Sequence, residues 1–182
     1  MVDTGNSTER GLCKILYFLI DCGEQMKILA TEVLTILHEQ NLKISACESF
    51  TGGMFSNKLT NIPGSSKVFV GSFISYSETM KKNIVKVSKR VIKKYGVISQ
   101  ECAEEMVLKT QKLLKSHLTI SFTGNAGPTS LENKNVGTAY ISILFLGRLE
   151  SFKFEMKTED RYKFKIGAVN FAFKEILNLI KK

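Results

Sequence analysis

From residue 26 onward the chain alternates between short apolar segments and longer amphipathic ones, and this alternation constrains the fold more than any other feature. Apolar residues at helical spacing predict helices over residues 26–40, 51–60, 78–85, 88–95, 100–115 and about 160–181. Short runs rich in β-branched and aromatic residues predict strands over 43–47, 68–76, 117–122, 136–146 and 149–156. Strands and helices interleaved in this way are typical of an α/β layered domain.

Turn and capping residues separate the predicted elements. Gly96 predicts the end of the helix over 88–95, and Ser99 is a suitable N-cap for the next helix. Gly147-Arg148 predicts the turn of a hairpin between the last two strands. Thr158-Glu159-Asp160 predicts the cap of the final helix.

The first 25 residues differ from the rest. Leu12–Cys22 contains a short apolar run, too short to span a membrane, and no small-residue cleavage site follows it. A regular helical pattern begins at Met26. We therefore treat residues 1–25 as an extension and residues 26–182 as the folded unit, and we expect no membrane partner.

Composition indicates an ordinary folded domain with an excess of positive charge. The chain has 182 residues, 43% hydrophobic and 24% charged, with a formal net charge of +9. All but four of the 26 basic residues are lysines. Lysine is a poor bidentate reader of bases and phosphates, so nucleic-acid binding is not expected.

Cysteine and histidine usage excludes several kinds of site. The four cysteines form no CxxC pair and no zinc-binding spacing, and the two histidines are far apart in sequence. A disulfide scaffold, a histidine-rich metal centre and a His-dependent catalytic triad are all disfavoured. We expect reduced thiols in a cytoplasmic protein with no metal.

The segment Glu48–Gly53 carries the first candidate chemistry. It joins a predicted strand to a predicted helix and contains Ser49 followed by Thr51, Gly52 and Gly53. Free N–H groups at a helix start can hold an oxyanion or a phosphate, so Ser49 is a candidate nucleophile beside an anion hole. On position alone, however, an ordinary helix cap is the simpler interpretation.

Further polar groups follow other predicted elements, where sites form in such folds. They are Gly64-Ser65-Ser66, the segment Tyr76–Lys81, the loop Thr123–Pro128 and Asp160-Arg161. Three of these segments have plain alternatives. They are Tyr76 as a strand-end tyrosine with Lys81 as a solvated side chain, Thr123–Pro128 as a simple tight loop, and Arg161 as a partner of Glu159 or Asp160. Glu48 is best interpreted as a structural carboxylate that accepts backbone N–H groups.

Together these segments resemble the CinA C-terminal domain family, which includes the nicotinamide-nucleotide amidases. The matching motifs are ESFTGG at 48–53, PGSS at 63–66, YSETMK at 76–81, GVIS at 96–99, TGNAGP at 123–128, VGT at 136–138 and DR at 160–161. Their order and spacing match along residues 26–182. Seven motifs in order are specific, although each alone is unremarkable.

The resemblance implies a layered α/β/α domain with a mixed central sheet. It also implies hydrolysis of the carboxamide of nicotinamide mononucleotide to nicotinate mononucleotide and ammonia, with no cofactor. A small-molecule nucleotide would be the substrate, and a homo-oligomer, a dimer or larger, is expected. The remaining alternatives are a non-catalytic member that binds nucleotides or is associated with competence or DNA damage, and an amidohydrolase with another amide substrate.

The resemblance assigns roles by position. Ser49 would be the nucleophile, Lys81 its base, and Tyr76 an aid to proton transfer or to the orientation of Lys81. The expected substrate-binding residues are Thr51, Gly52, Gly53, Ser66, Thr123, Gly124, Asn125 and Arg161.

A lysine acts as a base only when its pKa falls, and we expect burial and a nearby cation, Arg161 or Lys82, to lower the pKa of Lys81. Backbone N–H groups near Thr51 and Gly52 would hold the oxyanion. Three positions depart from the family pattern: Phe50 replaces a cysteine, Glu78 an asparagine and Asn125 an aliphatic residue. Phe50 lies directly beside the nucleophile and is expected to reshape the pocket.

Overall fold

The fold is that of a computed structural model, which describes the backbone of residues 7–182 and the side chains from residue 23 onward. The helical elements are α1 (Ser7–Glu39), α2 (Met54–Thr60), η1 (Ser65–Lys67), α3 (Glu78–Met80), η2 (Lys81–Val85), α4 (Lys89–Tyr95), α5 (Gln100–Leu114) and α6 (Arg161–Ile180). The strands are β1 (Ile44–Glu48), β2 (Phe69–Ile74), β3 (Leu118–Asn125), β4 (Thr138–Phe145) and β5 (Arg148–Glu155).

Across residues 7–182 the five strands form one sheet in the order β2-β1-β3-β4-β5. β1 runs parallel to both β2 and β3, whereas β4 and β5 are added as antiparallel strands. The sheet is therefore mixed, as expected. The parallel part places the carboxyl ends of β1, β2 and β3 at one edge of the sheet, where ligands bind in such folds.

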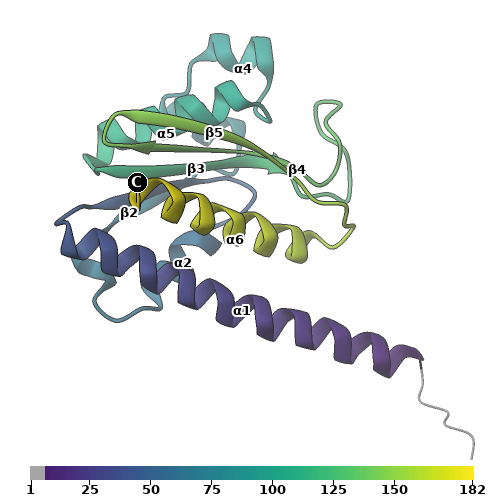
Figure 1. Cartoon of the computed structure of the whole chain (residues 1–182). Helices are drawn as coiled ribbons and strands as arrows, with labels where there is room; N and C mark the ends of the chain where they lie inside the picture. Colours follow the sequence, from purple (N-terminus) through teal and green to yellow (C-terminus); the bar gives the residue numbers. More distant parts are fainter. Residues whose placement is uncertain (1–6) are drawn as a thin grey trace, which may run out of the picture.

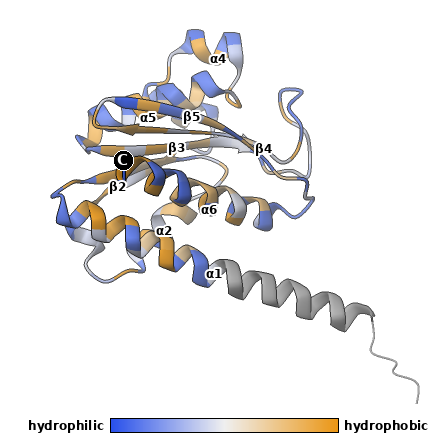
Figure 2. Cartoon of the chain, in the orientation of Figure 1, coloured by the Kyte–Doolittle hydropathy of each residue, from blue (hydrophilic) through white to orange (hydrophobic). Residues whose placement is uncertain are grey.

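Helices cover both faces of this sheet. α1, α2 and α6 pack on one face, and α4 and α5 lie on the other (Figure 1). The main core lies beneath α1 and α6, and a smaller cluster beside α5 includes Cys47, Val85 and Cys102. Hydrophobic residues concentrate in the central strands and on the helices that pack against them (Figure 2). The α/β/α layering is confirmed.

Several element boundaries differ from the predicted ones. α1 crosses the predicted start at Met26 without interruption, because no proline breaks the preceding segment. Residues 1–6 lie outside the described residues. The hairpin turn is Leu146-Gly147, one residue earlier than predicted, and both residues have positive φ. Such a two-residue turn matches the twist of the strands that it joins.

Two further differences fall at motif positions. β3 continues through Asn125, which pairs with Thr138, so half of the predicted Thr123–Pro128 loop is strand. The strand continues because β4 supplies hydrogen-bond partners along its whole length. The predicted helix over 78–85 is one turn of α-helix followed by a π-helical segment that starts at Lys81.

The carboxylate of Glu48 fixes the chain directly after β1. It is fully buried, and its two oxygens accept the backbone N–H groups of Gly53, Phe55 and Ser56 at 3.0–3.2 Å. The Ser56 hydroxyl donates a further bond of 2.6 Å. The structural interpretation of Glu48 is confirmed. These donors compensate its negative charge, and their hydrogen bonds hold the turn that contains Ser49.

We predict that Glu48→Gln lowers the free energy of unfolding by about 1–3 kcal/mol, because the new amide group places a donor against backbone donors. Urea unfolding measures the change. Glu159→Gln is the matched control, since it neutralises an exposed carboxylate and should have an effect within about 0.5 kcal/mol. Equal stabilities for the two variants would contradict the assigned role of Glu48.

Candidate active site

A cavity of about 250 Å³ opens at the carboxyl ends of the parallel strands. It brings together most of the predicted site residues from segments far apart in sequence. Those that line it are Ser49, Tyr76, Lys81, Thr123, Gly124, Asn125 and Arg161. The wall is completed by Phe50, Val97 and Ile98 and by the loop residues Ala126, Gly127, Thr129 and Leu131.

Ser49 and Lys81 are in direct contact. The Lys81 Nζ lies 2.7 Å from the Ser49 Oγ and 2.8 Å from the carbonyl oxygen of Ser75. Lys81 is 2% exposed and Ser49 6% exposed. A nucleophile within hydrogen-bond distance of a base, with the base held by a third group, is the geometry that activates a serine.

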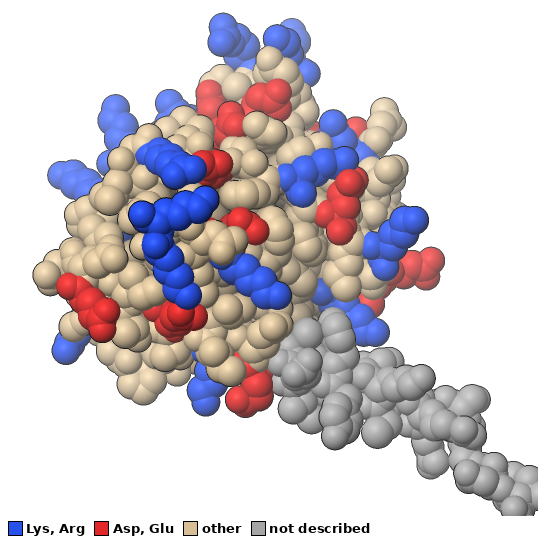
Figure 3. All heavy atoms as spheres, viewed as in Figure 1, with Lys and Arg blue, Asp and Glu red and all other residues tan. Residues whose placement is uncertain are grey.

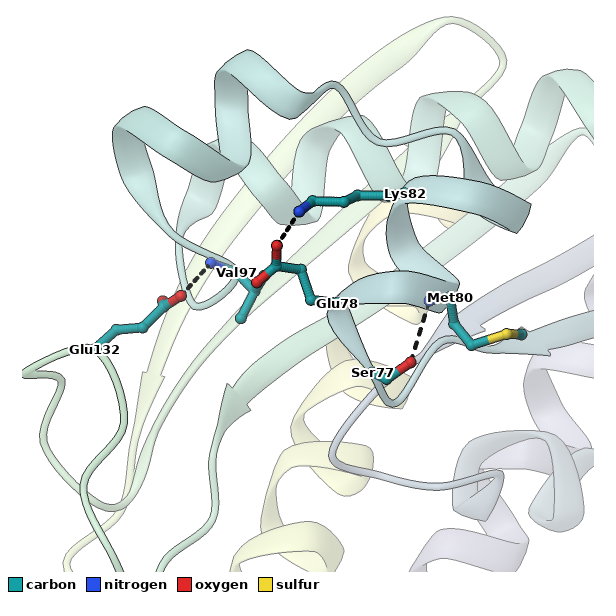
Figure 4. A network of polar contacts seen from close by, with 6 residues as sticks. All are labelled: Ser77, Glu78, Met80, Lys82, Val97 and Glu132. Carbon is teal, nitrogen blue, oxygen red and sulfur yellow. Dashed lines mark hydrogen bonds and ion pairs between the residues drawn. The ribbon is translucent and has the colours of Figure 1, made fainter.

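Burial lowers the pKa of Lys81 below the ordinary lysine value, because the ammonium form loses hydration. The thiols of Cys102 and Cys47 and the carboxylates of Glu132 and Glu78 oppose this shift. The predicted contribution of a nearby cation is therefore wrong: the shift comes from burial. Lys82 instead forms an ion pair with Glu78 (Figure 4).

The local backbone explains how a residue in a lysine-rich segment is buried. The Ser77 side chain caps α3 by accepting a hydrogen bond from the N–H of Met80 (Figure 4). This cap starts the helix shortly after the end of β2. The helix then widens into a π-turn at Lys81, and the N–H of Val87 donates to the Lys81 carbonyl. Widening changes the side-chain register. Lys81 is buried while Lys82 reaches the surface beside Glu78.

Tyr76 and Arg161 form the rim of the cavity. Tyr76 is 63% exposed, and its hydroxyl oxygen accepts a hydrogen bond of 3.0 Å from Arg161. Arg161 also donates to the carbonyl of Gly127 at 2.6 Å. The phenol therefore contacts the guanidinium rather than the Lys81 amine, and the carbonyl of Ser75 orients Lys81 in its place.

The end of β3 supplies the opposite wall. The Thr123 hydroxyl donates to the carbonyl of Val97 at 2.5 Å, which leaves its oxygen free to accept. Gly124 lies so close to β4 that a Cβ would approach the Ala139 Cβ to 2.7 Å. Asn125 donates to the Lys134 carbonyl and accepts from the Gly127 N–H, so its polar group shapes the loop after β3.

Glu132 is a site-supporting residue that the sequence analysis missed. Its carboxylate accepts the backbone N–H group of Val97 at 2.9 Å (Figure 4). It also accepts the N–H group of Ile98 at 3.0 Å. This contact ties the loop after β3 to the turn before α5. Its position as the one acidic residue between the TGNAGP and VGT motifs is the signal that marks it.

The turn that contains Gly52 and Gly53 holds Ser49 but contributes less to the cavity than predicted. The N–H of Gly52 donates to the Ser49 carbonyl, and that of Gly53 donates to Glu48. Both glycines have positive φ, a conformation that other residues adopt only with strain. The buried Thr51 hydroxyl has no hydrogen-bond partner among the described residues. Among those residues, the N–H groups of Phe50 and Thr51 are also unpaired.

Ser66 lies away from this cavity. It is exposed in η1, which precedes β2, whereas the cavity follows the carboxyl end of that strand. Strand β2 separates the two by about 20 Å. Within this chain, the PGSS motif therefore forms a turn between α2 and β2 rather than part of the cavity.

Phe50, the departure from the family pattern beside Ser49, turns its ring into the core. It is 3% exposed, and its ring centroid lies 5.4 Å from that of Phe164 on α6. Its bulk therefore links the Ser49 turn to α6 and also lines the cavity. Where the family pattern has a cysteine, Phe50 thus adds an aromatic contact with α6.

Other features of the described residues suggest no competing site. A hollow of about 350 Å³ between α1 and η1 is larger but has no nucleophile paired with a base. Within residues 23–182, no three His, Cys, Asp or Glu side chains are grouped to hold a metal. No described helix combines the length and apolar character needed to cross a membrane. Basic side chains are interspersed with acidic ones on the face seen in Figure 3.

Sequence comparison identifies the family. The sequence model of the CinA C-terminal domain matches residues 26–180. The chain belongs to this family. A competence-damage inducible protein from Listeria monocytogenes is 45% identical over 138 residues, 75% of this chain and 33% of that protein. A protein of the same name from Bacillus subtilis is 40% identical over 126 residues, 69% of this chain and 30% of that protein.

The chain spans about a third of the length of the curated relatives that it matches. Solved structures agree on the fold. A CinA superfamily protein from Klebsiella pneumoniae superposes with a TM-score of 0.82 at 23% identity, over 86% of this chain and 98% of that one. A competence/damage inducible protein from Agrobacterium tumefaciens gives 0.82 at 24% identity, over 87% and 96%.

We predict that Lys81→Met stabilises the CinA domain, and that its advantage over wild type shrinks as pH rises. The pKa of Lys81 is lower in the folded chain, so the unfolded chain binds more protons between the two pKa values. The free energy of unfolding of the wild type therefore increases with pH between these two pKa values. Below the folded pKa the wild type carries the full cost of burying the charged amine. Urea unfolding at about pH 7 and about pH 10 measures the difference.

Lys174→Met is the matched control, because it removes an exposed lysine from α6. It should show no such pH trend. A Lys81→Met advantage that stays constant over this range would contradict the lowered pKa.

Proposed function

We propose that this CinA domain hydrolyses the carboxamide of nicotinamide mononucleotide, giving nicotinate mononucleotide and ammonia, with Ser49 as nucleophile and Lys81 as base. The observation that carries the proposal is the 2.7 Å contact between the buried Lys81 amine and the Ser49 hydroxyl at the cavity floor. The choice of substrate rests on the motifs shared with nicotinamide-nucleotide amidases.

The contacts of Lys81 suit an uncharged amine. One N–H donates to the Ser75 carbonyl, and the 2.7 Å approach to the Ser49 hydroxyl would let the lone pair of the uncharged amine accept the Ser49 proton. As Ser49 attacks the carboxamide carbon, its proton moves to Lys81. The resulting ammonium returns that proton to the departing nitrogen, so ammonia leaves and an acyl-serine remains.

A water molecule then completes the cycle. Lys81, neutral again, accepts a proton from the water that attacks the acyl-serine, and returns it to Ser49 as the ester breaks. The acyl group leaves as a carboxylic acid, which releases its proton to solvent to give the carboxylate, and the free enzyme is restored. The charge that develops on the carbonyl oxygen needs N–H donors at each stage, worth about 2.7–4 kcal/mol each in enzymes of this kind.

The unpaired N–H groups of Phe50 and Thr51 are the best candidates for these donors. Gly52 is a poor candidate, because its N–H already donates to the Ser49 carbonyl. The anion hole therefore falls one residue nearer to Ser49 than the sequence suggested. At the rim, Arg161 and Tyr76 would contact the part of the substrate that extends outward.

The cavity volume favours a small substrate. At about 250 Å³ it lies just below the usual range for ligand pockets, roughly 300–1,000 Å³. It suits a pyridine carboxamide with its ribose near the opening better than a macromolecular substrate.

We predict that Ser49→Ala and Lys81→Met each reduce ammonia release from nicotinamide mononucleotide by at least about a thousandfold. The double variant should be little worse than either single one, because the two residues act as a unit. Enzyme-coupled ammonia detection measures the rates, and thermal unfolding checks that the variants fold.

Lys82→Met is the matched control for Lys81→Met, since Lys82 pairs with Glu78 at the surface, and it should retain activity within about threefold. Absence of turnover by the wild-type protein with several nucleotide amides would sink the proposal. Nucleotide binding without turnover would then favour the non-catalytic alternative.

A further inference from the structure

Helix α6 carries a second cation one turn beyond Arg161. Lys165 lies four residues later, so both side chains project from the same face of the helix. The Lys165 Nζ would lie 3.6 Å from a Cβ at Gly52, the exposed glycine of the Ser49 turn. Lys165 is therefore adjacent to the nucleophile turn while Arg161 lines the cavity.

Neither cation has an anionic partner in the described part of the chain. Arg161 donates to a backbone carbonyl and a phenol, both neutral. Lys165 forms no hydrogen bond or ion pair with any described residue, although it is half-buried. Glu48 is near, but four donors already occupy its oxygens.

The lowered pKa of Lys165 is consistent with the absence of an anionic partner. Burial lowers the pKa of Lys165, the positive charge of Arg161 lowers it further, and Glu48 only partly opposes them. Two like charges held on one helix face are destabilising until an anion binds between them. The electrostatic free energy of this pair is therefore unfavourable in the free chain and becomes favourable when an anion is bound.

We propose that Lys165 binds the phosphate group of the substrate, with Arg161 between it and the reacting carboxamide. This inference rests on the proposed function for the identity of the substrate. The N–H of Gly52 closes a four-residue turn by donating to the Ser49 carbonyl, so Gly52 and Ser49 are close in space. The Lys165 ammonium, which lies beside Gly52, is therefore also near Ser49. The ribose of a mononucleotide spans that interval, and its phosphate would meet the ammonium.

The proposal assigns specificity to Lys165. A phosphate monoester carries up to two negative charges and three acceptor oxygens, so it satisfies an ammonium better than a neutral hydroxyl does. Lys165 would thus distinguish a nucleotide from the corresponding nucleoside. Its side chain does not line the cavity beside Ser49 and takes no part in proton transfer.

The test compares wild type with Lys165→Met and Lys165→Gln on nicotinamide mononucleotide and nicotinamide riboside, which differ only in the phosphate. We expect the ratio of kcat/KM for nucleotide over riboside to fall about tenfold to a hundredfold in both variants. Lys165→Arg should restore most of the ratio. Lys174→Met removes the same charge from an exposed position on α6 and should leave the ratio unchanged.

A binding measurement separates this inference from the proposed function. Nicotinate mononucleotide is titrated calorimetrically into Ser49→Ala protein with and without Lys165→Met, and the second protein should bind at least about tenfold more weakly. If wild type releases no ammonia but this difference persists, the proposed function falls and the inference stands. Equal affinities, no binding to either protein, or equal loss of activity on both substrates would overturn the inference.

Discussion

The hydrogen bond between Lys81 and Ser49 is almost fully buried, and the chemistry proposed for the site depends on that burial. Burying an ammonium costs several kcal/mol unless it is paired, and the described residues give Lys81 no carboxylate partner. The fold therefore favours the neutral amine, which is the form that can accept a proton. The cost in stability at Lys81 accompanies a larger fraction of uncharged amine than an exposed lysine has at the same pH.

The surrounding structure keeps this pair in place through charged side chains that bind backbone groups. Glu48 holds the turn after β1, Glu132 holds the turn before α5, and Arg161 holds the loop after β3. Each uses a charged side chain to saturate backbone donors or acceptors. Three segments distant in sequence thus meet around Ser49 with little freedom, which suits a site whose geometry must be set in advance.

Sequence patterns predicted the element types, the capping roles of Ser99 and Asp160, and the structural role of Glu48, because these depend on local chemistry. The motif pattern predicted which distant residues meet. Position within a motif did not reveal that Ser66 lies at the far end of β2. The contacts of Tyr76, Glu132 and Lys165 depend on how helix α6 and the loops pack, which no local pattern encodes.

The state of Lys81 is the most direct test of this account. Carbon-13 NMR of protein labelled at the lysine ε-carbons follows each amine through its titration, and the Lys81 signal is the one absent from Lys81→Met. The account predicts that Lys81 titrates at lower pH than the exposed lysines, because burial lowers its pKa. A Lys81 signal that titrates together with the exposed lysines near about pH 10.4 would contradict it.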